Sequence, residues 1–275
     1  VLIQQPVYYP FSEVIRDNDR VIVSSDLILG EDNRYHIDLE DFEKQIVDHD
    51  VKMFLLCNPH NPSGRVFTKE ELTGMGDLCV KYGIKVVSDE IHNDFVFQGE
   101  HTVFAFVKKE YEDLCVVCTS PSKTFNLASM LISNIFIPGE KMRKKFQHEV
   151  DAAGISQLSA LGIVAAKTAY EKGDEWYHAM LSYVRENIAY VKAYIADHMP
   201  GVNVIDGEGT YLLWLDFRKT GIDPDELDRR IIYDAKLWLD SGKIFGKTGA
   251  GFQRINVAAP RKTVEECLER IRRIL

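Results

Sequence analysis

Residues 114–128 read Leu-Cys-Val-Val-Cys-Thr-Ser-Pro-Ser-Lys-Thr-Phe-Asn-Leu-Ala. The apolar first half predicts a buried strand, which stops at small hydroxyl residues and a single lysine, Lys123. Open α/β sheets bind their ligands at the edge where parallel strands end. Lys123 is therefore expected beside a ligand, with Ser120 and Ser122 close to it.

A lysine and hydroxyls in this arrangement suit a phosphorylated carbonyl cofactor. A lysine amine condenses reversibly with an aldehyde, and serine hydroxyls bind phosphate oxygens. Pyridoxal phosphate (PLP) is the cofactor with this chemistry. The alternative is a solvated lysine after an ordinary Ser-Pro-Ser turn. The residues at the ends of the neighbouring strands decide between these interpretations.

Two further predicted strands also end in polar residues. Residues 84–88 lead into Asp89-Glu90-Ile91-His92, and residues 51–57 lead into Asn58-Pro59-His60-Asn61-Pro62-Ser63-Gly64. Two Asn-Pro pairs exclude helix and strand from the second of these polar runs. Between the strands, a capping box at 68–71 and a terminal glycine predict a helix, so that the strands are parallel. Asn61, Asp89 and Lys123 are therefore expected at one edge of the sheet.

The remaining pattern predicts an α/β fold with a mostly parallel sheet between helices, followed by a smaller α+β domain. The apolar spacing in residues 174–199 is typical of one long amphipathic helix. We expect the domain boundary inside it, which gives domains 1–185 and 186–275. The other predicted elements are strands at 1–5, 21–25, 132–137, 202–205, 211–217 and 252–258, and helices at 38–49, 224–239 and 263–275, the last with a capping box at Thr263.

The composition excludes several classes of protein. The chain has 275 residues, of which 45% are hydrophobic and 27% charged, and a net charge of −9. This balance disfavours nucleic acid and anionic membranes, and no apolar run reaches the roughly 18 residues of a membrane helix. No signal peptide opens the chain. Cys115 and Cys118 face opposite sides of one strand, which disfavours a redox or metal site and indicates a reducing cytoplasm.

Four motifs in this order resemble the fold-type I PLP enzymes, the superfamily of the class I and II aminotransferases. The sequences of the Asp89 motif, the Lys123 motif and residues 209–216 are most similar to the cystathionine β-lyase branch of carbon–sulfur lyases. Each motif is weak alone, but their common order from Tyr8 to the C-terminus makes the resemblance specific. The motifs are Asn58-Pro-His-Asn61-Pro-Ser-Gly, Ser88-Asp89-Glu90-Ile91-His92, Ser120-Pro-Ser-Lys123-Thr-Phe-Asn and Arg254-Ile-Asn-Val-Ala.

The resemblance implies roles for the residues after the three strands. Lys123 would form the Schiff base with PLP and move the proton of the substrate Cα. Asp89 would pair with the pyridine nitrogen, whereas its alternative role is to cap a helix. Asn61 would donate to the phenolic oxygen of the cofactor, whereas its alternative is an Asx-turn.

Further residues receive roles in the same way. Tyr8 would stack on the pyridine ring, although its Pro-framed segment also suits a rigid turn. Ser120 and Ser122 would bind the phosphate. Arg254 would hold the substrate α-carboxylate with its planar fork, whereas its alternative is a surface ion pair. For His92 two interpretations stay open, donation toward the phenolic oxygen and packing beneath the site.

Three features depart from the family pattern. Leu131 stands where many aminotransferases have an arginine that pairs with the phosphate, and Ser129 stands where the lyase branch usually has glycine. The family also has roughly a hundred residues before the position of Val1, within the usual size of a domain. We therefore expect a partial sequence.

The function implied by the resemblance is that of a PLP-dependent carbon–sulfur β-lyase. It would convert cystathionine or cysteine-type amino acids to a thiol, pyruvate and ammonia. One alternative is an aminotransferase, and another is a non-catalytic PLP-fold protein with a regulatory or binding role. The resemblance also implies a homodimer with shared active sites and a small amino-acid substrate. From the composition we expect a cytoplasmic protein without nucleic-acid, membrane or metal partners.

Overall fold

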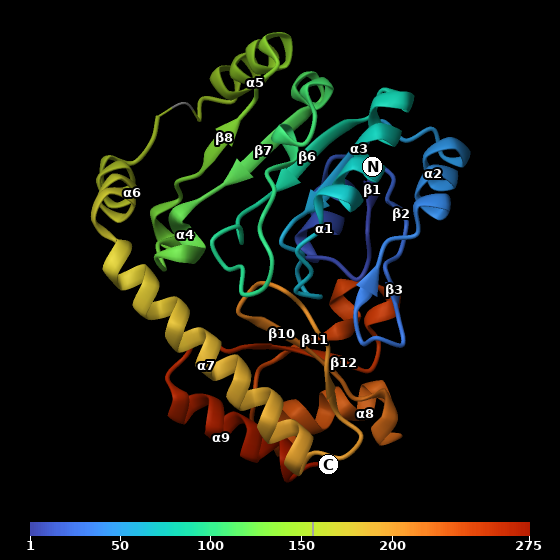
Figure 1. Ribbon diagram of the computed structural model, residues 1–275, viewed down its shortest axis with the longest axis vertical. Coiled ribbons are helices and arrows are strands. Elements are labelled where there is room, and N and C mark those ends of the chain that lie inside the picture. Colours follow the sequence, from blue (N-terminus) through green and yellow to red (C-terminus); the bar gives the residue numbers. More distant parts are fainter. Residues whose placement is uncertain (156) are drawn as a thin grey trace.

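A six-stranded sheet organises the larger part of the molecule (Figure 1). The computed structural model describes residues 1–155 and 157–275. The first five strands of the sheet are parallel, and only the last is antiparallel to its neighbour, so the predicted mostly parallel sheet is confirmed. The strand order is β2 (Val23–Ser24), β1 (Leu2–Ile3), β5 (Met53–Cys57), β6 (Lys85–Asp89), β7 (Cys115–Thr119) and β8 (Asn134–Phe136).

The central strands of this sheet bury one face beneath helices. Phe54, Val86 and Val117 are at most 2% exposed and pack with residues of α2 (Leu39–Asp48) and α3 (Lys69–Tyr82). Successive side chains of a strand point to opposite faces, so these alternate residues share one apolar surface.

The helix α3 begins and ends as the sequence predicts. The Thr68 hydroxyl accepts a hydrogen bond from Glu71 N, and the Glu71 carboxylate accepts one from Thr68 N. Gly83 ends the helix with a φ of 68°, in the left-handed region that glycine adopts without strain.

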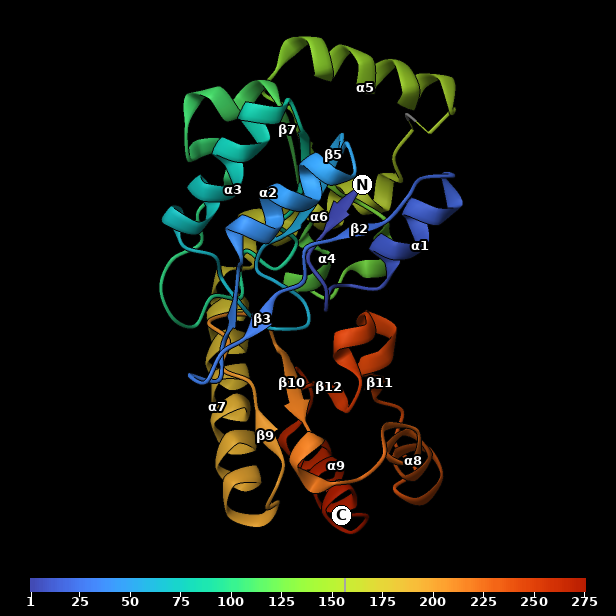
Figure 2. The ribbon, with the colours of Figure 1, turned by 90° about the vertical axis from the view of Figure 1, so that its right-hand side faces the viewer.

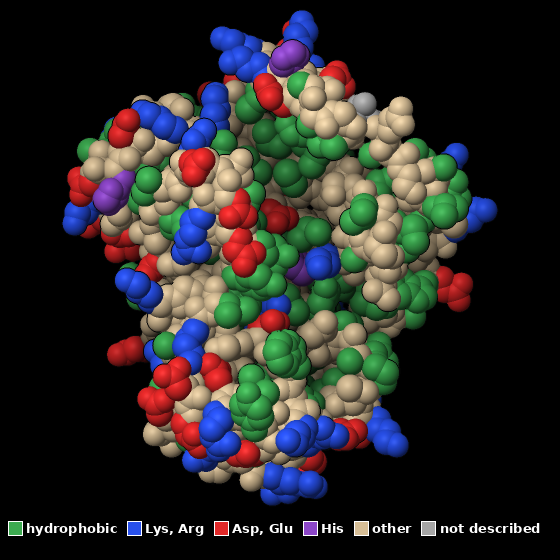
Figure 3. Space-filling view, turned by 180° about the vertical axis from the view of Figure 1, so that it is seen from behind, with side chains coloured by type: hydrophobic (Ala, Val, Ile, Leu, Met, Phe, Trp, Pro, Cys, Tyr) green, Lys and Arg blue, Asp and Glu red, His purple; other side chains and the backbone are tan. Residues whose placement is uncertain are grey.

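The opposite face of the sheet is covered only in part. Helix α1 (Pro10–Asp17) packs Ile15 near Ile3 and Cys57, whereas Ile135 of β8 is 40% exposed. Helix α5 (Glu140–Ala152) contributes no buried residue. Figure 3 views this side and shows hydrophobic side chains gathered in a hollow in its upper half.

The C-terminal part forms a four-stranded antiparallel sheet, which confirms the smaller α+β unit. Val191, Leu215 and Leu268 are completely buried between this sheet and the helices around it. The long helix α7 (Asp174–His198) runs diagonally from the large sheet to the small one (Figure 1). The boundary at residue 185 remains a prediction. The strand order is β11 (Asp240–Ser241), β12 (Phe252–Asn256), β10 (Leu212–Asp216) and β9 (Asn203–Val204).

Smaller elements complete the fold. Figure 2 shows the hairpin strand β3 at the level where the two sheets meet. These smaller elements are the hairpin β3 (Ile28–Leu29) and β4 (Tyr35–His36), the short helix α4 (Pro121–Thr124), and the helices α6 (Ala160–Lys172), α8 (Pro224–Arg229) and α9 (Arg261–Arg272).

Within the described ranges, every helix is too short or too polar to span a lipid bilayer.

Three expectations about helices were wrong. The helix predicted for 224–239 ends earlier, because a π-helical turn at Arg230–Asp234 comes after α8 and Lys236 has a φ of 55° that redirects the chain toward β11. The final helix begins at Arg261 after an N-cap at Pro260, so Thr263 caps nothing. The helix also ends at Arg272, before the predicted end at residue 275, and Leu275 is 40% exposed.

Candidate functional site

The ends of β5, β6 and β7 lie side by side, as the sequence predicts. In the sheet register, Asp89 lies between Cys57 and Cys118. The backbone continues this alignment beyond the strands, because Asn58 N donates to Asp89 O at 3.0 Å and Glu90 N donates to Cys118 O at 2.9 Å. Three segments therefore start from one edge of the sheet. They are the loop between β5 and α3 that carries Asn61 (the Asn61 loop), the residues that follow β6 from Asp89 onward (the Asp89 segment), and the turn with Lys123 after β7.

The short helix α4 positions Lys123. Ser120 is its N-cap, with an Oγ that accepts from Ser122 N at 3.1 Å and donates to Ile132 O at 2.6 Å. The hydroxyl of Thr124 donates to Asp94 Oδ2 at 2.6 Å. The turn is thus bonded to the residues just before β8 on one side and to Asp94, after β6, on the other, and Lys123 between these contacts is half-buried.

Asp89 is a carboxylate in a mostly apolar environment. Burial raises its pKa to about 6, while a hydrogen bond from Ile91 N at 3.2 Å and the charge of Lys123 act in the opposite direction. Its second oxygen, Oδ2, accepts no hydrogen bond within the described chain. Asp89 lines a cavity of about 320 Å³ with Cys118 and Ser120. This carboxylate is suited to a cationic partner that lies in the site.

His92 lies in the same place as a neutral imidazole. Burial lowers its pKa to about 3, and the charges of Lys123 and Arg254 add to this effect. Its Nδ1 is buried and has no hydrogen-bond partner among the described residues. Its ring contacts Phe95 and Tyr211 edge-on, with centroids 6.3 and 5.6 Å away. The structure thus combines features of both interpretations, since the ring packs and one nitrogen is left free.

Arg254 reaches the site from the small sheet. Its Nη1 donates to Asn61 Oδ1 at 2.7 Å, and its Nη2 and Nε donate to Asp240 Oδ2 at 2.5 and 3.1 Å. The guanidinium lies 4.8 Å from the ring centre of Phe245. The side chain of Arg254 is 12% exposed and that of its ion-pair partner Asp240 is 38% exposed. The role of Arg254 toward a substrate carboxylate remains a prediction. The orientation of Asn61 leaves its NH₂ group without a partner in the described chain.

Tyr8 completes the group on the side of α1. It is half-buried, and burial is the main cause that raises its pKa. The charge of Asp89 adds to this rise, whereas the charge of Arg254 acts against it. Tyr8 also acts on the pKa of Tyr211, which burial raises. Both phenols therefore stay protonated at neutral pH and lie close to the charged residues of the site.

The two predicted phosphate serines differ. The Ser120 hydroxyl already donates to Ile132 O and caps α4, whereas the Ser122 hydroxyl makes no hydrogen bond within the described chain. Leu131, in the place of the family arginine, is 87% exposed. Ser122 is therefore the better candidate for an anion, and the fold explains neither Leu131 nor Ser129.

Several residues of the site were not found by sequence reasoning. Asp240 and Phe245 hold Arg254, Asp94 holds Thr124, and Tyr211 packs on His92. Asp94 lies two residues after the end of the Ser88–His92 motif, and its role depends on a contact with Thr124, 30 residues further along the chain. Asp240 gave no signal, because its role depends on the pairing of β11 with β12.

The residues present fit PLP. Lys123 lies near enough to Asp89 and His92 for its charge to act on both, and Arg254 links His92 to Asn61. Within the described chain, Oδ2 of Asp89, Nδ1 of His92 and the NH₂ of Asn61 have no hydrogen-bond partner, and groups of these kinds complement a pyridinium and a phenolic oxygen. A mostly parallel sheet with a lysine, a carboxylate and an arginine converging at its edge defines the class of fold-type I PLP-dependent enzymes.

The chain belongs to the aminotransferase class I and II family, whose pattern it matches over residues 1–271. It is 38% identical to a cystathionine β-lyase, PatB, of Bacillus subtilis, in an alignment that covers 100% of this chain and 71% of the relative. A cystathionine β-lyase of Corynebacterium glutamicum is 32% identical, with 100% of this chain and 71% of the relative covered.

Solved structures agree with this family. Cystalysin from Treponema denticola, which contains PLP, superimposes with a TM-score of 0.95 at 37% identity over 99% of this chain and 69% of that chain. The PLP-bound C–S lyase of Staphylococcus hominis gives a TM-score of 0.93 at 32% identity over 100% of this chain and 70% of that chain.

Proposed function

We propose that this protein is a PLP-dependent carbon–sulfur β-lyase that acts on cystathionine or a related amino acid. The single observation that carries the proposal is the convergence of Lys123, Asp89 and Arg254 on one sheet edge. The similarity to cystathionine β-lyases over the whole chain gives the reaction class. The expected products are a thiol, pyruvate and ammonia.

Each residue has a definite task in this proposal. PLP, when bound, supplies an aldehyde that condenses with amines and a ring that takes up electron density from Cα. Arg254 binds the substrate carboxylate, with Asp240 and Asn61 fixing the plane of its guanidinium. Lys123 Nζ takes the proton of the substrate Cα. Asp89 keeps a proton on the ring nitrogen through its negative charge.

Pyruvate formation tests the proposal. We expect the purified protein, supplied with PLP, to release pyruvate from cystathionine without any keto-acid acceptor. Lys123→Ala removes the amine at the end of β7 and is expected to abolish the release, whereas Lys145→Ala, on the exposed surface of α5, leaves it unchanged. Lack of pyruvate from a cofactor-loaded wild-type protein would contradict the lyase assignment.

The same experiment separates the two other hypotheses. An aminotransferase requires a keto acid and produces a new amino acid from it, so that product without pyruvate would favour transfer. A regulatory or binding role predicts that Lys123→Ala leaves the biological activity intact.

We also propose that the protein forms a homodimer. Its partly covered sheet face exposes apolar side chains, among them Ile135 of β8 at 40% and Val14 of α1 at 50%, which line one cavity. Figure 3 shows hydrophobic side chains gathered on this side. Contiguous apolar surface of this kind is typical of interfaces. Sedimentation equilibrium is expected to give twice the mass of one chain, and Ile135→Asp is expected to weaken the association. A monomer at micromolar concentration would refute the dimer.

A further inference from the structure

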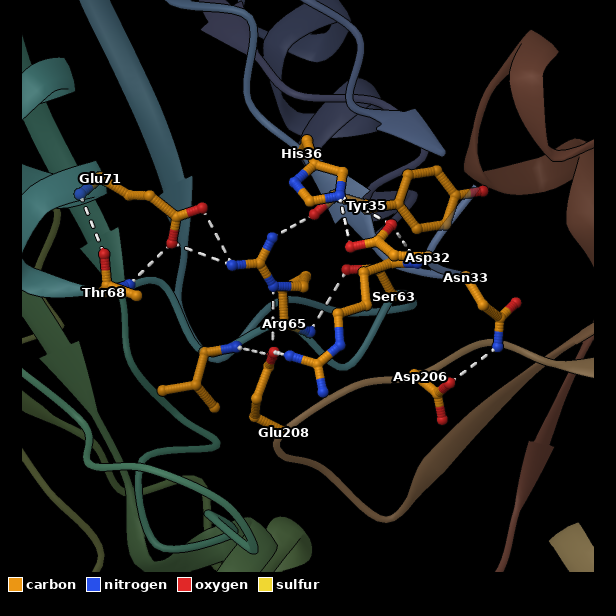
Figure 4. A network of polar contacts seen from close by, with 12 residues as sticks. Asp32, Asn33, Tyr35, His36, Ser63, Arg65, Thr68, Glu71, Asp206 and Glu208 are labelled. Atoms are coloured by element: carbon orange, nitrogen blue, oxygen red, sulfur yellow. Dashed lines mark hydrogen bonds and ion pairs between the residues drawn. The ribbon is translucent and has the colours of Figure 1, made fainter. Parts of the chain in front are cut away.

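A buried cation lies behind the loop that carries Asn61. Arg65 has a side chain only 7% exposed, and its guanidinium meets two carboxylates, Glu71 and Glu208 (Figure 4). Its Nη2 lies 2.9 Å from both oxygens of Glu71, its Nε donates to Glu208 Oε2 at 3.1 Å, and its Nη1 donates to Tyr35 O. Every side of the guanidinium is therefore occupied.

The two carboxylates come from different parts of the fold. Glu71 belongs to α3, next to the large sheet, whereas Glu208 lies in the segment between β9 and β10 of the small sheet. Glu208 also accepts from Val66 N at 3.0 Å and from Arg34 Nη1 at 3.0 Å. The side chain of Glu208 thus connects the segment between β9 and β10 to the Asn61 loop, through Arg65 and Val66.

The backbones approach closely at the same place. Gly209 N donates to Gly64 O at 2.8 Å. A Cβ at Gly207 would lie 2.7 Å from the Cα, C and O atoms of Gly64, so only glycine permits this contact. The ion pair is therefore backed by direct contact of two main chains.

A second link joins the same two parts inside the site. Arg254 on β12 donates to Asn61 Oδ1 at 2.7 Å. Strand β12 pairs with β10, in which Trp214 lies opposite Arg254. The Asn61 loop is thus connected to the small sheet twice, once through Arg65 and Glu208 behind it and once through Arg254 in front of it.

We propose that Arg65 and Glu208 are positioning residues that set the placement of Arg254 against Asn61, and hence the grip on the substrate carboxylate. This inference rests on the proposed function, because it assigns Arg254 to that carboxylate. Neither residue touches the substrate. Without Glu208, the buried Nε of Arg65 and the backbone N of Val66 would lose their acceptor, and the Asn61 loop would shift.

Truncation of Glu208 tests the inference. We expect Glu208→Ala to raise KM for the amino-acid substrate about tenfold with little change in kcat, because a displaced carboxylate site weakens substrate binding before the chemical step. The affinity for an amine that lacks the carboxylate is expected to stay constant. Glu208→Gln is the milder variant should Glu208→Ala fail to fold.

Two control variants isolate the contact. Asp206→Ala removes a carboxylate from the same segment, but Asp206 pairs with Asn33 (Figure 4) and not with Arg65. Its other partner is Lys192. Glu71→Ala removes a partner of Arg65 that lies beside the large sheet. Asp206→Ala is expected to leave KM unchanged, and Glu71→Ala is expected to lower stability with a smaller effect on KM.

Amide exchange of the cofactor-free protein provides a readout independent of activity. Glu208→Ala should accelerate exchange in residues 60–67, whereas Asp206→Ala should not. Equal effects of the two variants, or a loss of stability in Glu208→Ala without any change in KM, would overturn the inference. If the wild-type protein releases no pyruvate, the proposed function fails, and the exchange data still decide whether Glu208 positions the loop.

Discussion

Asp89 shows how local structure sets chemistry at the scale of one residue. Burial raises its pKa to about 6 from an ordinary value of 3.8. The folded protein therefore binds this proton more tightly than the unfolded chain does. In the cofactor-free protein, the contribution of Asp89 to the free energy of unfolding therefore falls as the pH rises from about 4 to about 6.

We predict opposite effects of Asp89→Asn on stability and activity. The amide carries no charge, so the cofactor-free variant should be more stable than the wild type at pH 7.5, and the difference should disappear near pH 4. Activity should fall on the order of 100-fold or more, because the amide offers no charge to a protonated ring nitrogen. Urea unfolding at both pH values and lyase kinetics check this. A variant less stable than the wild type at pH 7.5 would contradict the burial argument.

The sequence located some site residues and missed others for a physical reason. Lys123 and Asp89 were found because each lies at the end of a strand, and parallel strands end at one edge. Asp240 and Asp94 were missed because their partners lie 14 and 30 residues away, across a strand pair and a loop. No local pattern encodes such contacts.

At the scale of elements, the sequence predicted a helix correctly where local residues mark its ends. Helix α3 was predicted in full, since a capping box and a terminal glycine mark both its ends. Helix α1 was missed, although Pro10 at its first position was a usable signal.

The element after α8 shows the limit of periodicity. Leu237, Trp238 and Leu239 extend the apolar pattern, and this favoured a longer helix. The structure instead turns at Lys236 and pairs Asp240 with Arg254 in the small sheet. The pairing of β11 with β12 thus overrides the local helical pattern. The same turn places Asp240, the counter-ion of Arg254, beside it.

At the scale of the whole molecule, two sheets share one site. Residues from the small sheet, such as Trp214 and Phe252, belong to the same apolar cluster as Phe54 and Val86 of the large sheet. The sequence predicted both sheets, but this common core requires knowledge of how they pack. The continuous core explains how Arg254 is held against Asn61.

Buried histidines make this folded arrangement sensitive to acid. Burial lowers the pKa of both His60 and His92 to about 3, whereas an exposed histidine has a value near 6.5. Between these values the unfolded chain binds protons that the folded protein does not, so the free energy of unfolding falls as the pH decreases below about 6.5. Asp89 acts in the opposite direction, but it is one group against two.

We therefore predict a net loss of stability between pH 7.5 and pH 5.5. Over this interval each buried histidine lowers the free energy of unfolding by about 1.4 kcal/mol, and protonation of Asp89 raises it by about 0.8 kcal/mol. His60→Gln removes one of the two titrations, so the pH difference should shrink by about half or more, even if the variant is less stable at both pH values. His148→Gln on α5 is the control, because that exposed side chain is hydrated in the folded and unfolded states. Urea midpoints at the two pH values measure the difference, and an unchanged difference in His60→Gln would show that the acid sensitivity arises elsewhere in the molecule.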